Sequence, residues 1–317
     1  DFFSLFGFLM AVAVPVPLYP PARPDQIEDH LRRHQHILNN CQARLLITVA
    51  EAIPLVRLLK AQVDTLGRVV TPDELQDPGD AGSLPPVRAG DTAFLQYTSG
   101  STGIPKGVIL THANLLVNIQ VMGRVTGVVP EDVFVSWLPL YHDMGLIGAW
   151  LGSLYHGCQL VIMPPMTFLA HPDRWLWAIH RHRGTLSASP NFGYELCLKR
   201  IDDPLIEGLD LSSWRLAFNG AEPVSPETVV RFTRRFAPYG FRPEAMAPVY
   251  GLAESTVGLA FPPPGRGPLI DRVRREALMK TGVAIPADAD DPGPLRFVAC
   301  GHADRKSTRL NSSHRIR

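Results

Sequence analysis

Closely spaced cysteines are missing from this sequence. Its 317 residues include only four, Cys41, Cys158, Cys197 and Cys300, and no two of them form a C-x-x-C pair. This spacing predicts neither a zinc site nor a disulfide framework. Reduced thiols are typical of a cytoplasmic protein, which is the location we expect.

Charge bias and long hydrophobic runs are also lacking. The 31 basic and 30 acidic side chains give a formal net charge of +1, so charge alone implies no nucleic-acid partner. The apolar start, residues 1–14, is too short to cross a bilayer and is followed by Pro15 and Pro17. It also lacks a basic segment and an initiating Met. We expect a buried helix and no membrane anchor, with the true N-terminus upstream.

The end of the chain differs from the rest. Residues 303–317 carry five basic side chains, one acid and no periodic apolar pattern. This segment is open to three interpretations: a basic tail for nucleic acid or membrane, a disordered end, or a non-native one. It resembles the translated adapter sequence that contaminates some assemblies. We favour the last interpretation and assign it no function.

Helix-like and strand-like segments alternate along the chain. Apolar spacing predicts helices over 25–38, 53–59, 113–122, 146–155, 172–179, 194–200 and 225–236. Short apolar runs predict strands over 44–49, 68–70, 93–95, 108–111, 133–138, 159–163, 185–188, 214–218 and 247–250. Residues 77–90, rich in Pro and Gly, are a predicted loop. The order favours an α/β fold in which helices pack in layers on mostly parallel sheets.

The stretch from Tyr97 to Gly107 is the most informative. It holds three glycines, a lysine and four hydroxyl side chains: Gly100, Gly103, Gly107, Lys106, Thr98, Ser99, Ser101 and Thr102. Glycine lets backbone N–H groups approach a ligand, hydroxyls donate hydrogen bonds, and lysine supplies a charge. This combination is typical of a phosphate-binding loop. The alternative is an ordinary hairpin turn, which needs only about two to five residues.

The spacing excludes the commoner phosphate loops. A Walker A loop has lysine directly after glycine, whereas Lys106 follows Pro105, and the G-x-G-x-x-G spacing is absent. The contiguous stretch YTSGSTGIPKG, residues 97–107, resembles the signature of the adenylate-forming (AMP-binding) superfamily. That superfamily includes acyl-CoA synthetases, luciferases and peptide-synthetase adenylation domains. The resemblance implies that this loop holds the β- and γ-phosphates of ATP and that Lys106 has a catalytic role.

A second group of functional residues follows the predicted strand 133–138. The stretch WLPLYHDMGL, residues 137–146, places His142 at the carboxyl end of a strand, where α/β folds bind ligands. A core or capping histidine is the alternative. The stretch resembles a family motif that borders ATP and the acyl pocket. The resemblance implies a catalytic role for His142 and an acyl-pocket role for Met144 and Gly145.

Two further stretches also follow predicted strands. The first, SASPNFGYEL at residues 187–196, resembles a family segment that lines the acyl pocket. The resemblance implies acyl-pocket roles for Ser189, Asn191 and Phe192. The alternative is a turn followed by the start of a helix. FNGAEP, residues 218–223, resembles the adenine-binding segment, which implies contacts from Asn219, Gly220, Ala221 and Glu222. Glycine after a strand permits close approach to a planar ring. Glu222 is alternatively a solvated loop acid.

The stretch VYGLAEST, residues 249–256, completes the candidate site. A core tyrosine and a helix-capping glutamate are the alternative interpretation. The resemblance implies that Tyr250 stacks on adenine and that Glu254 is catalytic and holds Mg²⁺, an ion that prefers few carboxylates plus water. The same resemblance assigns nucleotide contacts to the rest of the motif, namely Gly251, Ser255 and Thr256.

Several segments resemble the fatty acyl-AMP ligase branch of the superfamily. They are residues 20–30, the YHDMGL form of the second motif, and residues 241–255. The resemblance implies activation of a fatty acid by ATP and Mg²⁺, and transfer to the thiol of an acyl carrier protein. The alternatives are an acyl-CoA synthetase, or a fragment that binds ATP or acyl-AMP without useful turnover.

The resemblance also bears on domain organisation. We expect residues 1–302 to be a partial, truncated N-terminal domain. The resemblance implies a further small C-terminal domain with a catalytic lysine, which we expect to be missing from these 317 residues. Residues 262–294, rich in Pro, Gly and charge, are a candidate branch-specific insertion or a plain surface loop.

Overall fold

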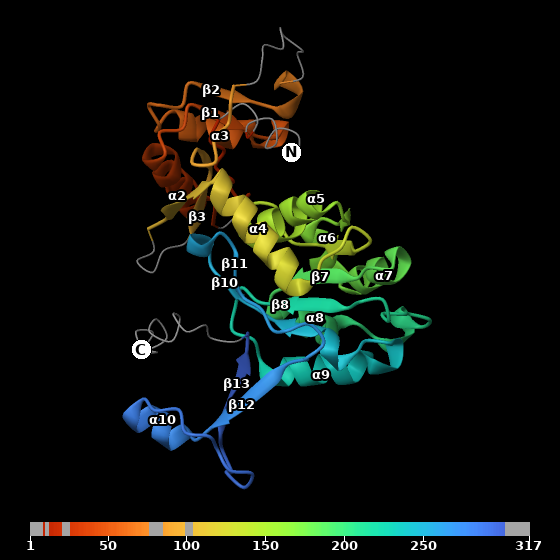
Figure 1. Ribbon diagram of the computed structural model, residues 1–317. Helices are drawn as coiled ribbons and strands as arrows, with labels where there is room; N and C mark the ends of the chain where they lie inside the picture. The colour runs from red at the N-terminus through yellow and green to blue at the C-terminus, as the bar shows by residue number, and fades with distance from the viewer. Residues whose placement is uncertain (1–8, 10–12, 21–25, 76–84, 99–103, 302–317) are drawn as a thin grey trace. The chain divides into compact units, whose positions relative to one another are not determined.

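The computed structural model describes residues 9, 13–20, 26–75, 85–98 and 104–301. By its internal contacts the chain divides into two compact units, residues 1–116 and 117–317 (Figure 1). Several predictions fall outside the described residues: those for Ser99, Gly100, Ser101, Thr102, Gly103, the first residue of the helix predicted over 25–38, and the tail 303–317.

The first unit begins with two helices and a pair of parallel strands. Helix α2 spans Ile27–Asn40 and α3 spans Ile53–Lys60, while β1 (Leu45–Ile47) pairs in parallel with β2 (Arg68–Val70). Short 3₁₀ turns, η2 (Ala50–Ala52) and η3 (Pro72–Leu75), border these elements. Leu38, Leu59, Val63 and Leu66 are buried together as a small core. The predicted helix–strand–helix–strand order is confirmed.

A hairpin follows in the same unit. Strand β3 (Thr92–Thr98) pairs antiparallel with β4 (Lys106–Thr111), and Thr98 is opposite Lys106. The connection, residues 99–105, is longer than a standard hairpin turn needs. Helix α4 (His112–Thr126) comes next and extends past the boundary between the units.

The second unit is built on a five-stranded sheet. All neighbours are parallel, in the order β6 (Gln159–Ile162), β5 (Val133–Ser136), β7 (Leu186–Ser189), β8 (Leu216–Asn219), β9 (Met246–Pro248). Its helices are α5 (Gly152–His156), α6 (Pro165–Ala170), α7 (Asp173–His182), α8 (Asn191–Arg200) and α9 (Pro226–Phe236). Short 3₁₀ turns are η5 (Asp203–Ile206), η6 (Ala237–Tyr239) and η7 (Pro243–Ala245). The α/β prediction with parallel strands is confirmed.

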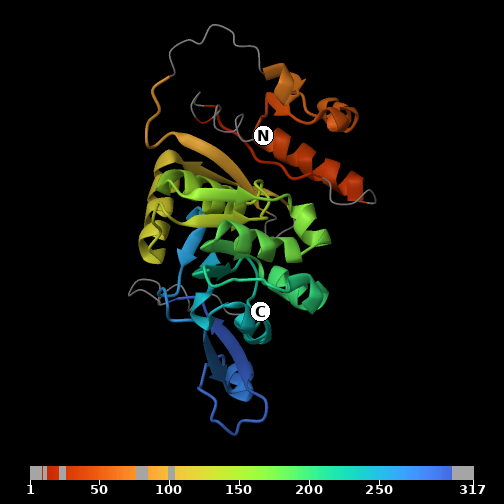
Figure 2. The same ribbon diagram turned by 90° about the vertical axis from the view of Figure 1, so that its right-hand side faces the viewer.

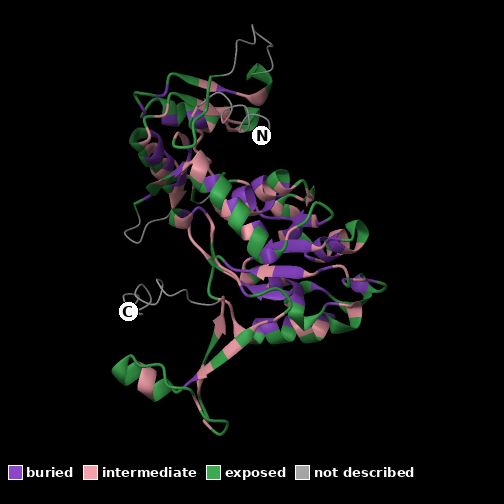
Figure 3. Cartoon of the chain, viewed as in Figure 1, coloured by how far each residue is buried: buried purple, intermediate pink, exposed green. Residues whose placement is uncertain are grey.

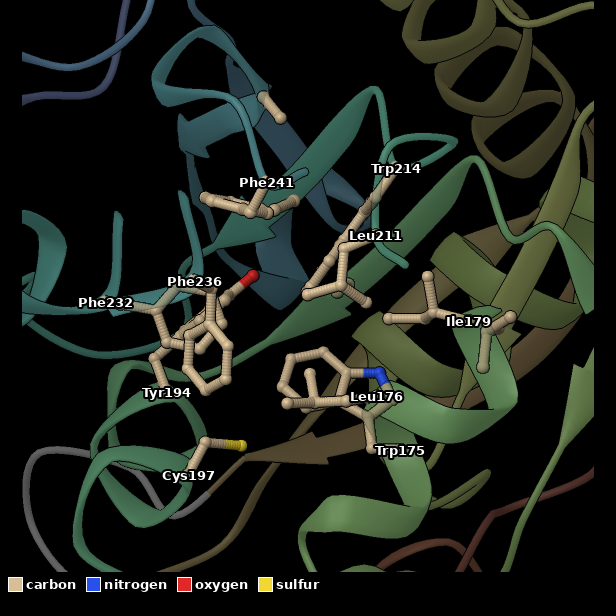
Figure 4. Packing of buried hydrophobic residues seen from close by; sticks show 14 of the residues in the cluster. Trp175, Leu176, Ile179, Tyr194, Cys197, Leu211, Trp214, Phe232, Phe236 and Phe241 are labelled. Atoms are coloured by element: carbon tan, nitrogen blue, oxygen red, sulfur yellow. The ribbon is translucent and has the colours of Figure 1, made fainter. Parts of the chain in front are cut away.

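Aromatic side chains from three helices form the core of this unit (Figure 4). Trp175 of α7 lies 5.5 Å from Tyr194 of α8 and 5.2 Å from Trp214, between ring centroids. The Trp175 indole donates to the hydroxyl of Ser187 on β7, at 2.9 Å, which satisfies a buried polar group. Figure 3 shows the sheet as largely buried, with its helices packed against it.

A buried ion pair ties the amino ends of the strands together. Arg215, which precedes β8, donates to the carboxylate of Asp132, which precedes β5, and to the carbonyls of Thr126 and Gly127. Thr185, before β7, donates to the same carboxylate at 2.7 Å. Burial alone would raise the pKa of Asp132, but hydrogen bonds from Arg215 and Thr185 hold it below its usual value. The pair is therefore charged and fully hydrogen-bonded.

Two predicted elements need correction. The strand predicted over 247–250 exists as β9, but its predicted end is wrong. Strand β9 ends at Pro248, and the chain then enters a separate ribbon, in which β10 (Tyr250–Gly251) pairs antiparallel with β11 (Gly258–Ala260). The predicted helix 146–155 is two helices, a π-helix η4 (Met144–Leu151) and then α5. Its predicted end is confirmed, since Gly157 adopts the left-handed conformation at φ 71°.

Residues 262–294 are not a plain loop. They contain β12 (Leu269–Val273) and α10 (Arg275–Thr281), and β12 pairs antiparallel with β13 (Leu295–Ala299). Figures 1 and 2 both place these elements at one end of the second unit, beyond α9. Their identity as a branch-specific insertion stays a prediction.

A pair of buried histidines on α2 makes the first unit sensitive to acid. His30 and His34 lie with ring centroids 3.9 Å apart, and burial, then His30 and Arg33, lower the pKa of His34 to about 4. The unfolded chain, with the ordinary pKa near 6.5, therefore binds more protons below that pH. Stability from this group is lost as pH falls from about 6.5 to about 4.

We expect protonation of His34 to lower the free energy of unfolding of the first unit by about 2 kcal/mol between about pH 7.5 and about pH 5. The variant His34→Leu should lose much less over the same range. Differential scanning calorimetry at the two pH values measures the difference. The matched control is His36→Gln, an exposed histidine on the same helix. Equal losses for H34L and the native chain would contradict the assignment.

Candidate functional site

The parallel register gathers the predicted site residues at the carboxyl edge of the sheet. Ser189 at the end of β7 is paired with Asn219 at the end of β8, and Asn219 is paired with Pro248 at the end of β9. The motifs that contain Ser189, Asn219 and Tyr250 lie at these strand ends, whereas the His142 motif follows β5. This edge is where parallel sheets bind ligands.

Asn219 is a fully buried polar residue at this edge. Its side-chain amide donates to the Oδ1 of Asn191 at 3.3 Å, and the same oxygen accepts from the backbone N–H of Ser225. The Oδ1 of Asn219 is buried and has no hydrogen-bond partner. A buried acceptor without a partner is costly unless a ligand supplies a donor. Asn219 therefore suits contact with an amino group such as that of adenine.

The loop after β8 has a constrained backbone. A Cβ on Gly220 would lie 2.8 Å from the carbonyl oxygen of Val249, so only glycine fits there. Ala221 has a φ of 69°, which is uncommon for a residue with a side chain. The carboxylate of Glu222 accepts a 2.5 Å hydrogen bond from the backbone N–H of Phe192, at the start of α8. A carboxylate is favourable at a helix N-terminus, so Glu222 joins the two motifs.

Aromatic rings line the neighbouring part of the edge. Phe192 is 45% exposed and lies edge-on to Trp137, with ring centroids 5.8 Å apart. Trp137 in turn stacks on Phe168 at 3.9 Å. An exposed phenylalanine on a rigid aromatic support presents an apolar surface beside the polar residues. The hydroxyl of Ser189 donates to the carbonyl of Pro190 at 2.8 Å.

Tyr250 and Glu254 lie on the two-stranded ribbon. Tyr250 is 51% exposed, and Glu254 is exposed within the 3₁₀ turn η8 (Ala253–Ser255). Thr256 is buried with φ 75° and ψ −60°, and the Val257 N–H donates to the carbonyl of Ser255. This is a γ-turn of the rare, strained kind. Strain of this sort persists where surrounding structure enforces it, and it is concentrated at functional sites.

His142 is paired with its neighbour in sequence. Its Nδ1 lies 2.8 Å from the Oδ1 of Asp143, and its side chain is about half exposed. The hydrogen bond with Asp143 raises the pKa of His142 above its usual value, against the effect of burial. Asp143 also accepts from the Met144 N–H and so caps the π-helix η4. Helices of this wide kind are often found at functional sites.

Gly145 is tightly packed. A Cβ there would lie 2.2 Å from the carbonyl oxygen of Pro139, so this glycine is required by the backbone around it. Met144 is half-buried and packs against the core of the second unit. The roles of both residues in an acyl pocket stay predictions.

The first unit holds the described ends of the glycine-rich loop. Lys106 is exposed and Thr98 half-buried, on opposite strands of the hairpin. The hydroxyl of Tyr97 donates to the side chain of Asn40 on α2, which anchors β3. A Cβ on Gly107 would lie 2.9 Å from the Tyr97 ring, so glycine lets the two strands pack at this point.

No group of three His, Cys, Asp or Glu side chains within the described ranges is placed to hold a metal ion. A magnesium ion that binds with substrate phosphates needs only one or two carboxylates. Glu254, exposed on its turn, fits that requirement. None of the helices in the described part of the chain has the length and apolar character needed to cross a bilayer.

Comparison with known proteins identifies the family. The model of the AMP-binding enzyme family matches residues 2–289. The chain belongs to the AMP-binding enzyme family. A medium-chain-fatty-acid–[acyl-carrier-protein] ligase of Moorena producens is 36% identical over 303 residues, covering 94% of this chain and 51% of the relative. A long-chain-fatty-acid–AMP ligase of Mycolicibacterium smegmatis is 37% identical, covering 94% of this chain and 48% of the relative.

Solved structures agree with this family assignment. A structure from a study of fatty acyl-adenylate ligases from E. coli and L. pneumophila has a TM-score of 0.91 and 35% identity, covering 95% of this chain and 54% of that one. A fatty acyl-adenylate ligase from L. pneumophila, in complex with acyl adenylate and pyrophosphate, has a TM-score of 0.80 and 36% identity, covering 94% and 51%. This chain, a member of the AMP-binding family, spans about half the length of the curated relatives it matches.

Replacing Asp143 tests the pairing at His142. In Asp143→Asn the side chain can still accept from Met144, but the hydrogen bond to His142, the main cause of the raised pKa, loses its charged acceptor. We expect the pKa of His142 to fall, which an NMR titration of the imidazole measures. The native pair adds stability at low pH, and this stability is lost as pH rises through the raised pKa. A His142 pKa that is the same in both proteins would contradict this.

Gly251 is predicted to be indispensable to the ribbon. A Cβ there would lie 1.7 Å from the carbonyl oxygen of Val257, so Gly251→Ala should destabilise the second unit by about 1–3 kcal/mol. The control is Gly148→Ala, since a Cβ on Gly148 meets no described atom within 4 Å. All five tryptophans belong to the second unit, so urea unfolding followed by tryptophan fluorescence reports on it alone. A native-like G251A would refute the packing argument.

Proposed function

We propose that this chain supplies the ATP- and acyl-binding part of a ligase that activates a fatty acid as its acyl-adenylate. The observation that carries the proposal is the buried, partnerless Oδ1 of Asn219 at the carboxyl edge of the sheet. The exposed ring of Phe192 follows the neighbouring strand, and Tyr250 and Glu254 follow the strand on the other side. Polar and apolar groups therefore lie together at the carboxyl edge of the sheet, which is where parallel sheets bind ligands.

In the proposed reaction a fatty-acid carboxylate oxygen attacks the α-phosphorus of ATP. The new P–O bond forms as the bond to the β-phosphate oxygen breaks, and pyrophosphate leaves. No covalent enzyme intermediate is needed, so catalysis consists of orientation and charge neutralisation. Mg²⁺, when bound, would screen the phosphate charges. We assign its binding to Glu254.

The protein's own residues have distinct proposed roles. Asn219, Gly220, Ala221, Glu222 and Tyr250 bind the adenine end, with Gly251, Ser255 and Thr256 beside them. Thr98, Lys106 and the loop Ser99, Gly100, Ser101, Thr102 and Gly103 hold phosphates. His142 orients the reacting groups, since its raised pKa favours the positively charged form beside two anions. Met144, Gly145, Ser189, Asn191 and Phe192 contact the acyl chain.

We propose an acyl carrier protein as the acceptor of the acyl group. Support comes from the relative of Moorena producens, which is described as a ligase to acyl carrier protein. Coenzyme A is the alternative acceptor, because a 38% identical relative of Mycobacterium bovis is described as a putative fatty-acid–CoA ligase. Mass spectrometry of the product formed with each acceptor distinguishes them. Efficient acyl-CoA formation would exclude our choice.

Fatty-acid-dependent exchange of labelled pyrophosphate into ATP tests the adenylation step. We expect exchange by the native chain and a loss of at least about tenfold in Glu254→Gln, which removes the proposed Mg²⁺ ligand. Glu244→Gln, at an exposed acid outside the site, is the control and should match the native chain. If the native chain shows no exchange above background while it binds ATP, it is a binding fragment without useful turnover.

A further inference from the structure

One side chain ties the Tyr250–Glu254 ribbon to a helix far away in sequence. The side-chain amide of Asn118, on α4, donates to the carbonyl of Gly258 at 2.8 Å. Its Oδ1 accepts from the N–H of the same glycine at 3.1 Å. Both residues belong to the second unit, and 140 positions separate them. The amide therefore contacts Gly258 as a neighbouring strand would.

The ribbon needs such a tether. In β10–β11, Tyr250 pairs with Ala260 and Gly251 with Gly258, and a register shift lies between these pairs. A two-stranded ribbon of this size is marginal in water by itself. The segment between the strands also holds the strained turn at Thr256. Strain persists only where the surrounding structure enforces it, and Asn118 binds directly next to this segment.

The helix is shaped for this contact. The sulfur of Met122, one turn after Asn118, would lie 2.6 Å from a Cβ on Gly258, so glycine lets β11 pack closely against this helix. Asparagine is a weaker helix former than leucine or alanine, because its side chain competes for backbone hydrogen bonds. Here the side chain bonds to a distant backbone, which compensates for that local cost.

We propose that Asn118 is a positioning residue that holds Tyr250 and Glu254 in the orientation in which they bind Mg·ATP. This proposal rests on the proposed function for its ligand. The hydrogen bonds from Asn118 reach neither the nucleotide nor the metal; they fix Gly258, and through it the turn and the two strands. Loss of the pair should loosen residues 250–258 and leave the five-stranded sheet intact.

Two variants of Asn118 separate hydrogen bonding from packing. Asn118→Ala removes both hydrogen bonds. Asn118→Asp keeps the volume and the acceptor but places a charged oxygen against the Gly258 carbonyl. The control is Gln120→Ala, an exposed residue on the same helix. A side chain that merely fills space would be replaced without effect by aspartate, so only the tether predicts that N118D fails like N118A.

The first measurement needs no nucleotide. Hydrogen–deuterium exchange of the native chain and its variants should show residues 250–258 exchanging about tenfold faster in N118A and N118D. Exchange in β7 and β8, and in Q120A throughout, should be unchanged. Native-like exchange of residues 250–258 in N118A, or in N118D, would overturn the tether.

The second measurement is calorimetric titration with Mg·ATP. We expect about tenfold weaker binding in N118A and N118D than in the native chain and Q120A. Faster exchange with unchanged ATP affinity would overturn the positioning role. If the native chain binds no ATP, the proposed function fails for this chain and the positioning role falls with it. The exchange data still decide whether the tether exists.

Discussion

Parallel pairing of β7, β8 and β9 is the constraint on which the site depends. The register places Ser189, Asn219 and Pro248 side by side, so the three segments that follow begin at one edge. At the opposite end, the Asp132–Arg215 ion pair fastens the residues that precede β5 and β8. Aromatic packing of α7, α8 and α9 leaves the sheet little freedom to shift. The candidate binding edge is thereby held in one arrangement.

The ribbon with Tyr250 and Glu254 is held differently. It leaves the rigid sheet after Pro248 and depends on glycines, a strained turn and the side chain of Asn118. Such a segment can open without unfolding the core, because few buried contacts hold it. The candidate site thus combines a fixed edge, which includes Asn219, with an adjustable part that carries the proposed metal ligand.

Much of this could be predicted from the sequence, and the reasons are local. Short apolar runs alternating with amphipathic segments predict parallel strands and helices, and the motif stretches predict the family. The switch of Tyr250 into a separate ribbon could not be predicted. The apolar run over 247–250 fits one continuous strand as well as it fits the two strands β9 and β10 that the structure shows. The Asn118–Gly258 contact was missed because nothing local indicates a partner 140 positions away. The pairing of His142 with Asp143 was open to prediction, since the two are adjacent.

The central claim is that the carboxyl edge of the five-stranded sheet binds the adenine ring. Photolabelling with 8-azido-ATP, followed by peptide mapping, tests it most directly. The account predicts label within residues 218–222 or 248–256, and suppression of that label by excess ATP. Label confined to other peptides, and suppressed in the same way, would contradict it.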